Sequence, residues 1–367
     1  MTNDDKTQEF KLISKTIDGD EIFLNHDSIV VKFAGKRNAI VTSWLNGGYS
    51  EDLSAVFNHQ LSQENIDEYG DGGILGFLEM LSYDFYNKLD LKGNKLSGLV
   101  TSAQIDEYSI AVERYKDIEV LAITTAGVRV NAVSAGDVAS YYELNGEYDF
   151  DLENEDPNPN KPGTINNIIL INCRLDESSL LLAEMIAVEA KAVALRDLMT
   201  SSNYSSEIAT GTGTDGIAIC SNLQSDNFIE NVSKHAKIGE LIANAVIRSI
   251  KEALANLQWL TPSYQLNALV RLDRFKMNLD EFYDKSLNLD EMEKKEFIMS
   301  LIKVSKNPEL VGYVSLIIHI IDQYRIGLLD KKPALKVLNS ILNSNFNRKE
   351  WNSMKLLLEY VIEKQIE

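Results

Sequence analysis

The chain has 367 residues, of which 44% are hydrophobic, so it is long enough and apolar enough to form two globular domains. Its formal net charge of -19 argues against nucleic acid or an anionic membrane surface as the partner, because both attract basic proteins. Its two cysteines, Cys173 and Cys220, stand in apolar, strand-like runs, so we expect buried free thiols and exclude both a disulfide framework and a zinc site built of cysteines.

The first residues, MTNDDKTQEF, lack the basic start and apolar core of a signal peptide, and later apolar runs are too short to span a bilayer. We therefore expect a cytoplasmic protein. Four short β-branched runs follow, over residues 10–17, 21–25, 28–33 and 38–45, separated by turn-forming clusters such as DGD and GKRN. They predict β structure. Apolar residues then recur at helical spacing over 51–61 and 73–89.

Strand character returns over residues 96–104, 108–115 and 118–130. Residues 143–163, rich in acids and prolines, predict an exposed acidic loop. Residues 164–175 predict a central strand, and residues 176–199 predict a long helix with Asp176 as its N-cap. Glu189 interrupts the apolar run of this helix, so we expect its carboxylate to point inward and to need a partner.

A strand over 216–220 and a second long helix over 234–257 complete this part of the chain. From Trp259 onward the sequence predicts helices only. Residues 259–367 hold 16 basic and 15 acidic residues, whereas residues 1–258 hold the remaining 20 and 40. We therefore expect an α+β protein. A mixed-sheet N-terminal domain packed with long helices spans 1–258, and an all-α C-terminal domain spans 259–367.

The stretch IATGTGTDGIAIC, residues 208–220, is the first candidate site. Its three glycines permit positive φ angles and a close approach to a ligand, and the threonines between them add hydroxyl groups. Asp215 is a candidate general base, metal ligand or turn residue. The stretch lacks the GK[ST] ending of a Walker loop and the spacing of a dinucleotide fingerprint. A plain glycine-rich turn stays an alternative.

Two further features carry candidate chemistry. His235 lies near the start of the predicted helix over 234–257, with Lys237 and Glu240 around it, and an imidazole that titrates near neutrality is a natural proton shuttle. A solvated first turn is the alternative interpretation. The segments SWLNGGYS (43–50) and TTAGVRVNAVSAGD (124–137) combine small residues with Asn46 and Asn131, and each is weak evidence by itself.

Together these segments resemble the adenosylcobinamide amidohydrolase family. The resemblance rests on LNGG, TAGV followed by NA and AGD, GTINNIILIN, EAKAVALRDL, IATGTGTDGIAI and HAKIGELIANAV, in this order over roughly residues 28–257. Ser134 departs from the family, which commonly has a basic residue there. The resemblance implies hydrolysis of the amide between the corrin ring's f side chain and aminopropanol. The products are adenosylcobyric acid and 1-amino-2-propanol, in corrinoid salvage for coenzyme B12 synthesis.

Amide hydrolysis needs an activated nucleophile, oxyanion donors and a proton for the leaving amine. We predict Asp215, His235 and Thr212 as the catalytic residues, gathered in one threonine-lined hollow. The residues predicted to bind the corrinoid are Asn46, Gly47, Gly48, Asn131, Thr210, Gly211, Gly213, Thr214, Lys237 and Glu240. No cofactor is required, although His235, Asp215 and Glu189 would be the ligands of a hydrolytic zinc ion if one is used.

Two alternatives stay open at this point. A non-catalytic corrinoid-binding protein would use the C-terminal helices to dock a partner, and a structural protein would bind no corrinoid. The amphipathic C-terminal helices also suit homo-oligomerisation or binding of a protein partner.

Overall fold

The computed structural model describes residues 9–61, 73–93, 95–150, 163–286 and 291–366. They form two compact units: an α/β unit from Met1–Thr200 and Ile208–Leu260, and a helical unit from Ser201–Glu207 and Thr261–Glu367. The chain therefore passes between the units three times, at 200/201, 207/208 and 260/261. The excursion over 201–207 has no counterpart in the sequence-based prediction, which divides the chain once, at 258.

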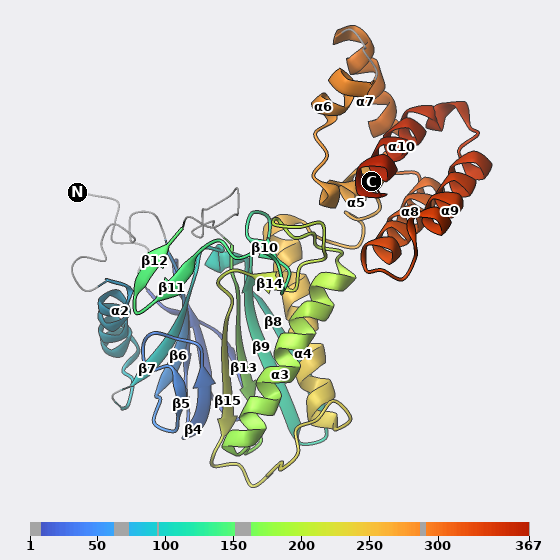
Figure 1. The fold of residues 1–367 in the computed structure, drawn as a ribbon. Helices are drawn as coiled ribbons and strands as arrows, with labels where there is room; N and C mark the ends of the chain where they lie inside the picture. Colours follow the sequence, from blue (N-terminus) through green and yellow to red (C-terminus); the bar gives the residue numbers. More distant parts are fainter. Residues whose placement is uncertain (1–8, 62–72, 94, 151–162, 287–290, 367) are drawn as a thin grey trace, which may run out of the picture. The chain divides into compact units, whose positions relative to one another are not determined.

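The α/β unit contains two stacked sheets (Figure 1). The five-stranded sheet has the order β1 (Lys11–Lys15), β2 (Glu21–Leu24), β3 (Ser28–Lys32), β6 (Ala55–Gln60), β7 (Leu96–Thr101). The six-stranded sheet has the order β5 (Gly48–Ser50), β4 (Arg37–Val41), β15 (Gly216–Asn222), β13 (Ile165–Ile171), β9 (Ile118–Ala126), β8 (Ser109–Tyr115). β13 and β15 are parallel, and their outer neighbours β9 and β4 run antiparallel to them.

Helices cover the outer face of each sheet. One apolar cluster joins the five-stranded sheet to α2 (Gly73–Leu89), and a second fills the space between the sheets. A third joins the six-stranded sheet to α3 (Glu177–Asp197) and α4 (Lys237–Gln258), which lie side by side. The result is a four-layer α/β/β/α arrangement in which β13, buried along its whole length, is central.

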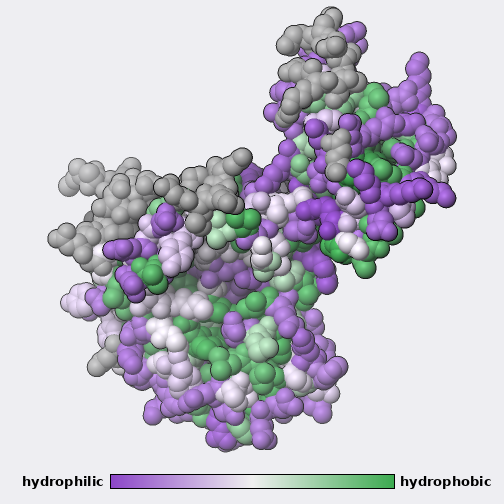
Figure 2. All heavy atoms as spheres, viewed as in Figure 1, coloured by the Kyte–Doolittle hydropathy of each residue, from purple (hydrophilic) through white to green (hydrophobic). Residues whose placement is uncertain are grey.

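The long helix α3 begins as the sequence predicts, because the Asp176 carboxylate accepts a hydrogen bond from Ser179 N at 2.7 Å. Its outward face is also apolar: Leu181, Leu182, Met185 and Val188 are between 38% and 56% exposed. Figure 2 shows apolar side chains on this side of the α/β unit. The prediction for Glu189 is wrong, because Glu189 is exposed and Lys191 is the charged residue of α3 that turns inward.

The helical prediction for residues 51–61 is also wrong, because 55–60 form β6. Ala55, Val56 and Phe57 are fully buried, and β6 pairs with β3 on one side and β7 on the other. A strand that is buried on both faces of its sheet shows no alternation of polar and apolar residues, so its sequence does not distinguish a strand from a helix.

Two short antiparallel strand pairs are formed by residues between β9 and β15 in the sequence. The strands β10 (Ala132–Val133) and β14 (Gly211–Thr212) pair with each other. Part of the predicted acidic loop forms an exposed hairpin of β11 (Tyr142–Leu144) and β12 (Glu147–Asp149). Residues 151–162 of that loop lie outside the described residues. A short 3-10 helix, η3 (Ile105–Glu107), precedes β8.

The helical unit has an apolar core of its own. Its elements are α5 (Ala268–Leu272), η4 (Asp273–Phe275), α6 (Leu279–Ser286), α7 (Glu291–Ser305), α8 (Pro308–Arg325), α9 (Lys331–Asn345), η5 (Lys349–Trp351) and α10 (Asn352–Ile366). The α+β class and the helical character of the C-terminal region are thus confirmed. Among the helices in the described part of the chain, none has the length and apolarity needed to cross a bilayer.

Candidate active site

Several sequence-predicted segments meet at one end of the six-stranded sheet. Asp215 directly precedes β15, and its Oδ1 accepts from Ile165 N, the first residue of β13, at 3.0 Å. Thr42, directly after β4, donates its amide N–H to Ile217 O at 2.9 Å. Segments before the parallel strands and after their antiparallel neighbours therefore share this end.

Asp215 is the centre of the cluster. Besides Ile165 N, its carboxylate accepts from Thr212 N at 3.0 Å and from the Thr212 hydroxyl at 2.5 Å. Lys191 on α3 forms an ion pair with Oδ2 from the other side, and both charged side chains are only 14% exposed. These donors fix the orientation of the carboxylate and hold a threonine hydroxyl and an ammonium group against it.

Gly211, Gly213 and Gly216 serve a different purpose from the one the sequence suggests. None of these glycines has a positive φ angle. A Cβ atom on Gly211 would lie 2.2 Å from Asp215 Oδ2 and 3.0 Å from Lys191 Nζ. The absence of a side chain therefore makes room for the ion pair, rather than allowing an unusual backbone conformation.

Hydroxyl and amide groups surround this pair. The Thr214 hydroxyl lies 2.7 Å from the Thr164 hydroxyl, and Asn131 Nδ2 donates to Gly163 O at 2.8 Å. The Thr210 hydroxyl accepts from Ala135 N at 2.9 Å. A Cβ atom on Gly213 would contact the amide group of Asn131. The structure thus brings together the predicted residues Asn131, Thr210, Gly211, Thr212, Gly213, Thr214 and Asp215.

A buried chain of amides extends from this end into the space between the sheets. Asn166 Nδ2 donates to Asn58 Oδ1 at 2.7 Å, and Asn58 Nδ2 donates to Thr125 Oγ1 at 2.9 Å. The second amide atom of Asn166, Oδ1, is buried without a hydrogen-bond partner in the described structure. Nothing in the local sequence pattern predicts that these side chains, more than 60 residues apart, meet.

The predicted segment Asn46–Gly48 lies at the same end of the sheet, after β4. Asn46 and Gly48 have positive φ angles of 49° and 82°, and a Cβ atom on Gly47 would lie 2.0 Å from Ser43 O. Asn46 Nδ2 donates to Leu96 O at 2.8 Å, which fixes this exposed turn against β7. The turn is close to the candidate site by sheet register, and the described structure shows no hydrogen bond between the turn and Asp215.

The structure does not bring His235 to Asp215. Lys237 at the start of α4 lies 5.0 Å from the centroid of the Tyr115 ring, and Tyr115 ends β8 at the far end of the sheet. The opposite end of α4 approaches the Asp215 side, because Val128 N donates to Gln258 Oε1 at 3.2 Å. His235, Lys237 and Glu240 therefore lie away from the cluster, against the expectation of a single shared hollow.

The contacts of α3 support the same separation. Lys234, the neighbour of His235, pairs with Glu189 at 2.5 Å, whereas Lys191 pairs with Asp215. Residues two apart on a helix point to nearly opposite sides, so α3 lies between the two pairs. The hypothetical zinc ligands His235, Asp215 and Glu189 are consequently not gathered, and the described residues contain no group of three or more His, Cys, Asp or Glu side chains arranged to hold a metal ion. Lys237 and Glu240 pair with each other at 2.6 Å.

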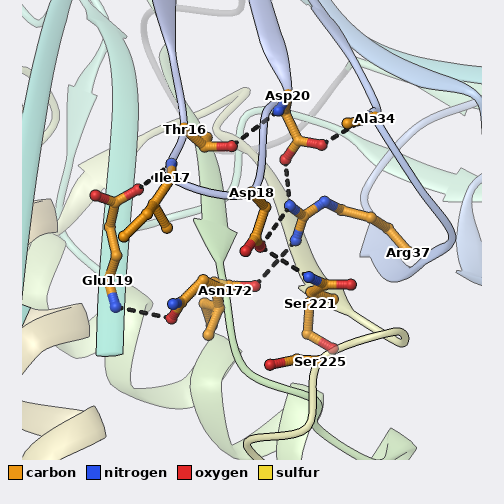
Figure 3. Close-up of polar contacts among 12 residues, drawn as sticks. Thr16, Ile17, Asp18, Asp20, Ala34, Arg37, Glu119, Asn172, Ser221 and Ser225 are labelled. Atoms are coloured by element: carbon orange, nitrogen blue, oxygen red, sulfur yellow. Dashed lines mark hydrogen bonds and ion pairs between the residues drawn. The ribbon is translucent and has the colours of Figure 1, made fainter. Parts of the chain in front are cut away.

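A second polar cluster lies at the other end of β13 (Figure 3). Arg37 donates to Ile171 O at 3.0 Å and to Asp18 Oδ2 at 2.9 Å, and it forms an ion pair with Asp20. Glu119 accepts from Ile17 N at 3.0 Å. These contacts join the β1–β2 turn to the six-stranded sheet, so we interpret the cluster as structural.

The cysteine thiols are not candidate nucleophiles. Cys173 and Cys220 are both free and buried. Burial raises the pKa of the Cys220 thiol to about 12 and that of the Cys173 thiol to about 11. The fraction of reactive thiolate at neutral pH is therefore very small.

The adenosylcobinamide amidohydrolase family model matches residues 13–262, which is more than half of the chain. The chain belongs to this family. Its sequence is also 29% identical, over 247 residues, to an uncharacterized protein of Methanocaldococcus jannaschii, covering 66% of this chain and 91% of that protein. As a member of the adenosylcobinamide amidohydrolase family, the chain is assigned to the amidohydrolases, and the matched range contains the whole Asp215 cluster.

Two solved structures resemble this member of the adenosylcobinamide amidohydrolase family weakly. The PH0078 protein from Pyrococcus horikoshii OT3 is 12% identical with a TM-score of 0.32, covering 68% of this chain and 83% of that one. A beta-aminopeptidase from a Burkholderia species is 13% identical with a TM-score of 0.31, covering 67% and 81%. Similarity at this level does not bear on the reaction.

Proposed function

We propose that this protein hydrolyses adenosylcobinamide to adenosylcobyric acid and 1-amino-2-propanol, as a step of corrinoid salvage in the cytoplasm. Family membership supports an amidohydrolase, and the observation that carries the assignment to this site is the Thr212–Asp215–Lys191 cluster. It places a hydroxyl group and an ammonium group within hydrogen-bond reach of one carboxylate. A nucleophile, a base and a proton donor are groups that an enzyme can use to cleave an unactivated amide.

Asp215 has the role of the base in this proposal. Its carboxylate accepts the proton of the attacking hydroxyl group, while the surrounding N–H donors keep it oriented. The corrin ring carries primary amides at its periphery, and the nearby hydroxyl and amide groups are suitable partners for them. The residues proposed to bind these amides are Asn46, Gly47, Gly48, Asn131, Thr210, Gly211, Gly213 and Thr214.

His235, Lys237 and Glu240 are not part of the proposed site. The proton of the leaving amine must therefore come from another group than the imidazole that the sequence suggests. No metal ion is assigned a role here, and the cobalt of the corrinoid belongs to the substrate.

The test is chromatographic separation of adenosylcobinamide from adenosylcobyric acid after incubation with the full chain. We expect conversion by the wild-type protein and a loss of at least 100-fold in kcat/KM for Asp215→Asn, because the amide cannot accept a proton. Tight corrinoid binding without cleavage by the wild type would instead support the non-catalytic binding protein. Absence of both binding and cleavage would leave only the structural alternative.

We further propose that the helical unit mediates self-association or binds a protein partner. The observation behind this is the exposure of large apolar side chains on its helices, among them Met299, Ile302 and Leu316. Light scattering of the full chain at micromolar concentration tests the first possibility. A monomer at every concentration would exclude self-association under those conditions.

A further inference from the structure

We infer that cleavage at this site passes through an ester of Thr212 and that Lys191 protonates the departing amine. A primary amine or hydroxylamine then replaces water as the nucleophile that cleaves the ester. The inference rests on the proposed function. It adds an acyl-transfer activity, an acceptor class and a residue that sequence motifs did not single out as catalytic.

The first observation is the direction of the Thr212 hydroxyl bond. Thr212 Oγ1 donates its hydrogen to Asp215 Oδ1 at 2.5 Å, so the proton that must leave already points at its acceptor. Two backbone amides, from Ile165 and Thr212, hold the same carboxylate, which prevents it from turning away. The hydroxyl oxygen also accepts a long hydrogen bond from Thr214 N, at 3.4 Å, which leaves its other lone pair to attack a carbonyl carbon.

The second observation is the ion pair on the opposite carboxylate oxygen. Lys191 Nζ binds Asp215 Oδ2, and both groups are largely withdrawn from solvent. When Asp215 takes the proton of Thr212, its negative charge disappears and the ammonium loses its partner. A buried ammonium without a counter-ion is a stronger acid, so Lys191 becomes able to donate a proton at the moment the amine leaves.

The third observation concerns the developing oxyanion. Gly213 follows Thr212 directly and is exposed, and its N–H has no hydrogen-bond acceptor within the described chain. A free backbone N–H next to the attacking oxygen is the usual donor to such an oxyanion.

The Thr212 Oγ–carbon bond forms as the hydroxyl proton moves to Asp215, and the carbon–nitrogen bond breaks as Lys191 gives its proton to the nitrogen. 1-Amino-2-propanol then leaves. The proton on Asp215 passes to the neutral Lys191 amine, which restores the charged Asp215–Lys191 ion pair. Water then attacks the ester and regenerates Thr212 with a free carboxylic acid, whereas hydroxylamine attacks it to give a hydroxamate.

The experiment incubates the full chain with adenosylcobinamide and hydroxylamine and measures the corrinoid hydroxamate by chromatography and mass spectrometry. We expect the hydroxamate fraction and the rate of amine release both to rise with hydroxylamine concentration, because the added nucleophile resolves an ester that accumulates during turnover. Acid quenching during turnover is expected to leave an ester on the peptide that contains Thr212. Thr212→Ser should keep both products, and Thr212→Ala should lose both by at least 100-fold.

Lys191 is tested by the chemistry of the leaving group. Lys191→Arg keeps the ion pair but removes a group able to donate, so we expect at least a 100-fold loss on adenosylcobinamide. The loss should be under fivefold on the p-nitrophenyl ester of adenosylcobyric acid at the same side chain, because that group leaves without a proton. An equal loss on both substrates would show that Lys191 is only structural and would overturn its assigned role.

Different outcomes test the covalent route and the proposed function separately. Amide cleavage without hydroxamate or ester, or with Thr212→Ala retaining a tenth of the wild-type rate, would overturn the covalent route and leave the proposed function standing. A folded wild-type chain that binds adenosylcobinamide without cleaving it would overturn both.

Discussion

Arg37 and Asp20 form an ion pair in which the side chains retain only 2% and 0% of their accessible surface. The pair joins the turn after β1 to the first residue of β4, and Asp18 and Ile171 O complete the environment of the guanidinium. A charge so deeply buried depends on its partner, because no water can replace it.

Removing one member of this pair should therefore be costly. Arg37→Met leaves the Asp20 carboxylate buried without its counter-ion, and we expect a loss of about 3–5 kcal/mol in the free energy of unfolding. The double variant Arg37→Met/Asp20→Asn should recover part of that loss in a denaturant titration. Additive effects of the two substitutions would contradict a direct coupling.

The buried imidazole of His59 predicts a dependence of stability on pH. Burial lowers the pKa of His59 from 6.5 to about 4, against a weaker opposing effect of Asp27. Between these pH values the unfolded chain therefore binds more protons than the folded chain. The contribution of His59 to the free energy of unfolding is fully present above pH 6.5 and is lost as the pH falls toward 4. The full effect is roughly 3 kcal/mol.

Chemical denaturation between pH 7 and pH 4 measures this contribution. His59→Gln should flatten the acid side of the stability curve. His26→Gln is the matched control, because His26 is exposed and its pKa is raised by the hydrogen bond and charge of Asp27. Equal slopes for the wild type and His59→Gln would exclude His59 as the source.

Gly211 offers a test of the active-site geometry that touches no polar group. An alanine Cβ would collide with Asp215 Oδ2 and press on Lys191 Nζ, so Gly211→Ala must separate the pair. We expect kcat/KM for adenosylcobinamide to fall at least 100-fold while the far-ultraviolet circular dichroism stays unchanged. Gly76→Ala, whose Cβ enters open space, is the control. Retention of half the wild-type activity by Gly211→Ala would remove the pair from catalysis.

Arg274 gives a prediction for the helical unit. It is buried, donates to Ser206 O at 2.7 Å, and binds both carboxylate oxygens of Asp322, at 2.8 and 3.2 Å. Arg274→Met should reduce the free energy of unfolding of this unit by about 2 kcal/mol. This loss is smaller than the one expected for a fully buried ion pair, because Asp322 is partly exposed to solvent. Hydrogen exchange over α8 is the measurement. Arg325→Met, which removes the more exposed pair with Glu207, should cost under about 1 kcal/mol.

Much of the fold is readable from local patterns. The strand runs, the N-cap at Asp176 and the helices after residue 261 appear where periodicity and capping predict them. The helical prediction for residues 55–60 is wrong because burial on both faces of the sheet removes the polar–apolar alternation that identifies a strand. Local patterns carry no information about pairing partners, so the neighbours of each strand come only from the structure.

Because sequence patterns are local, they indicate only those members of the candidate site that are close together in the sequence. The residues around Asp215 are adjacent in sequence, so their proximity was accessible, whereas Lys191 is 24 residues away on α3. The separation of His235 from Asp215 has a topological cause. Asp215 precedes β15, but a helix that follows a strand and packs back on its sheet starts at the other end of that strand. The order Asp215, β15, α4 therefore separates the carboxylate from the imidazole.

The excursion of residues 201–207 has a mechanical consequence. It leaves the α/β unit just after α3, which carries Lys191, and returns just before the turn that carries Asp215. Ala209 N donates to Thr200 O at 2.8 Å across its base. Ser202 N also donates to Glu207 O at 2.9 Å, so two backbone hydrogen bonds hold the ends of the excursion together and keep the residues after α3 next to those before Asp215.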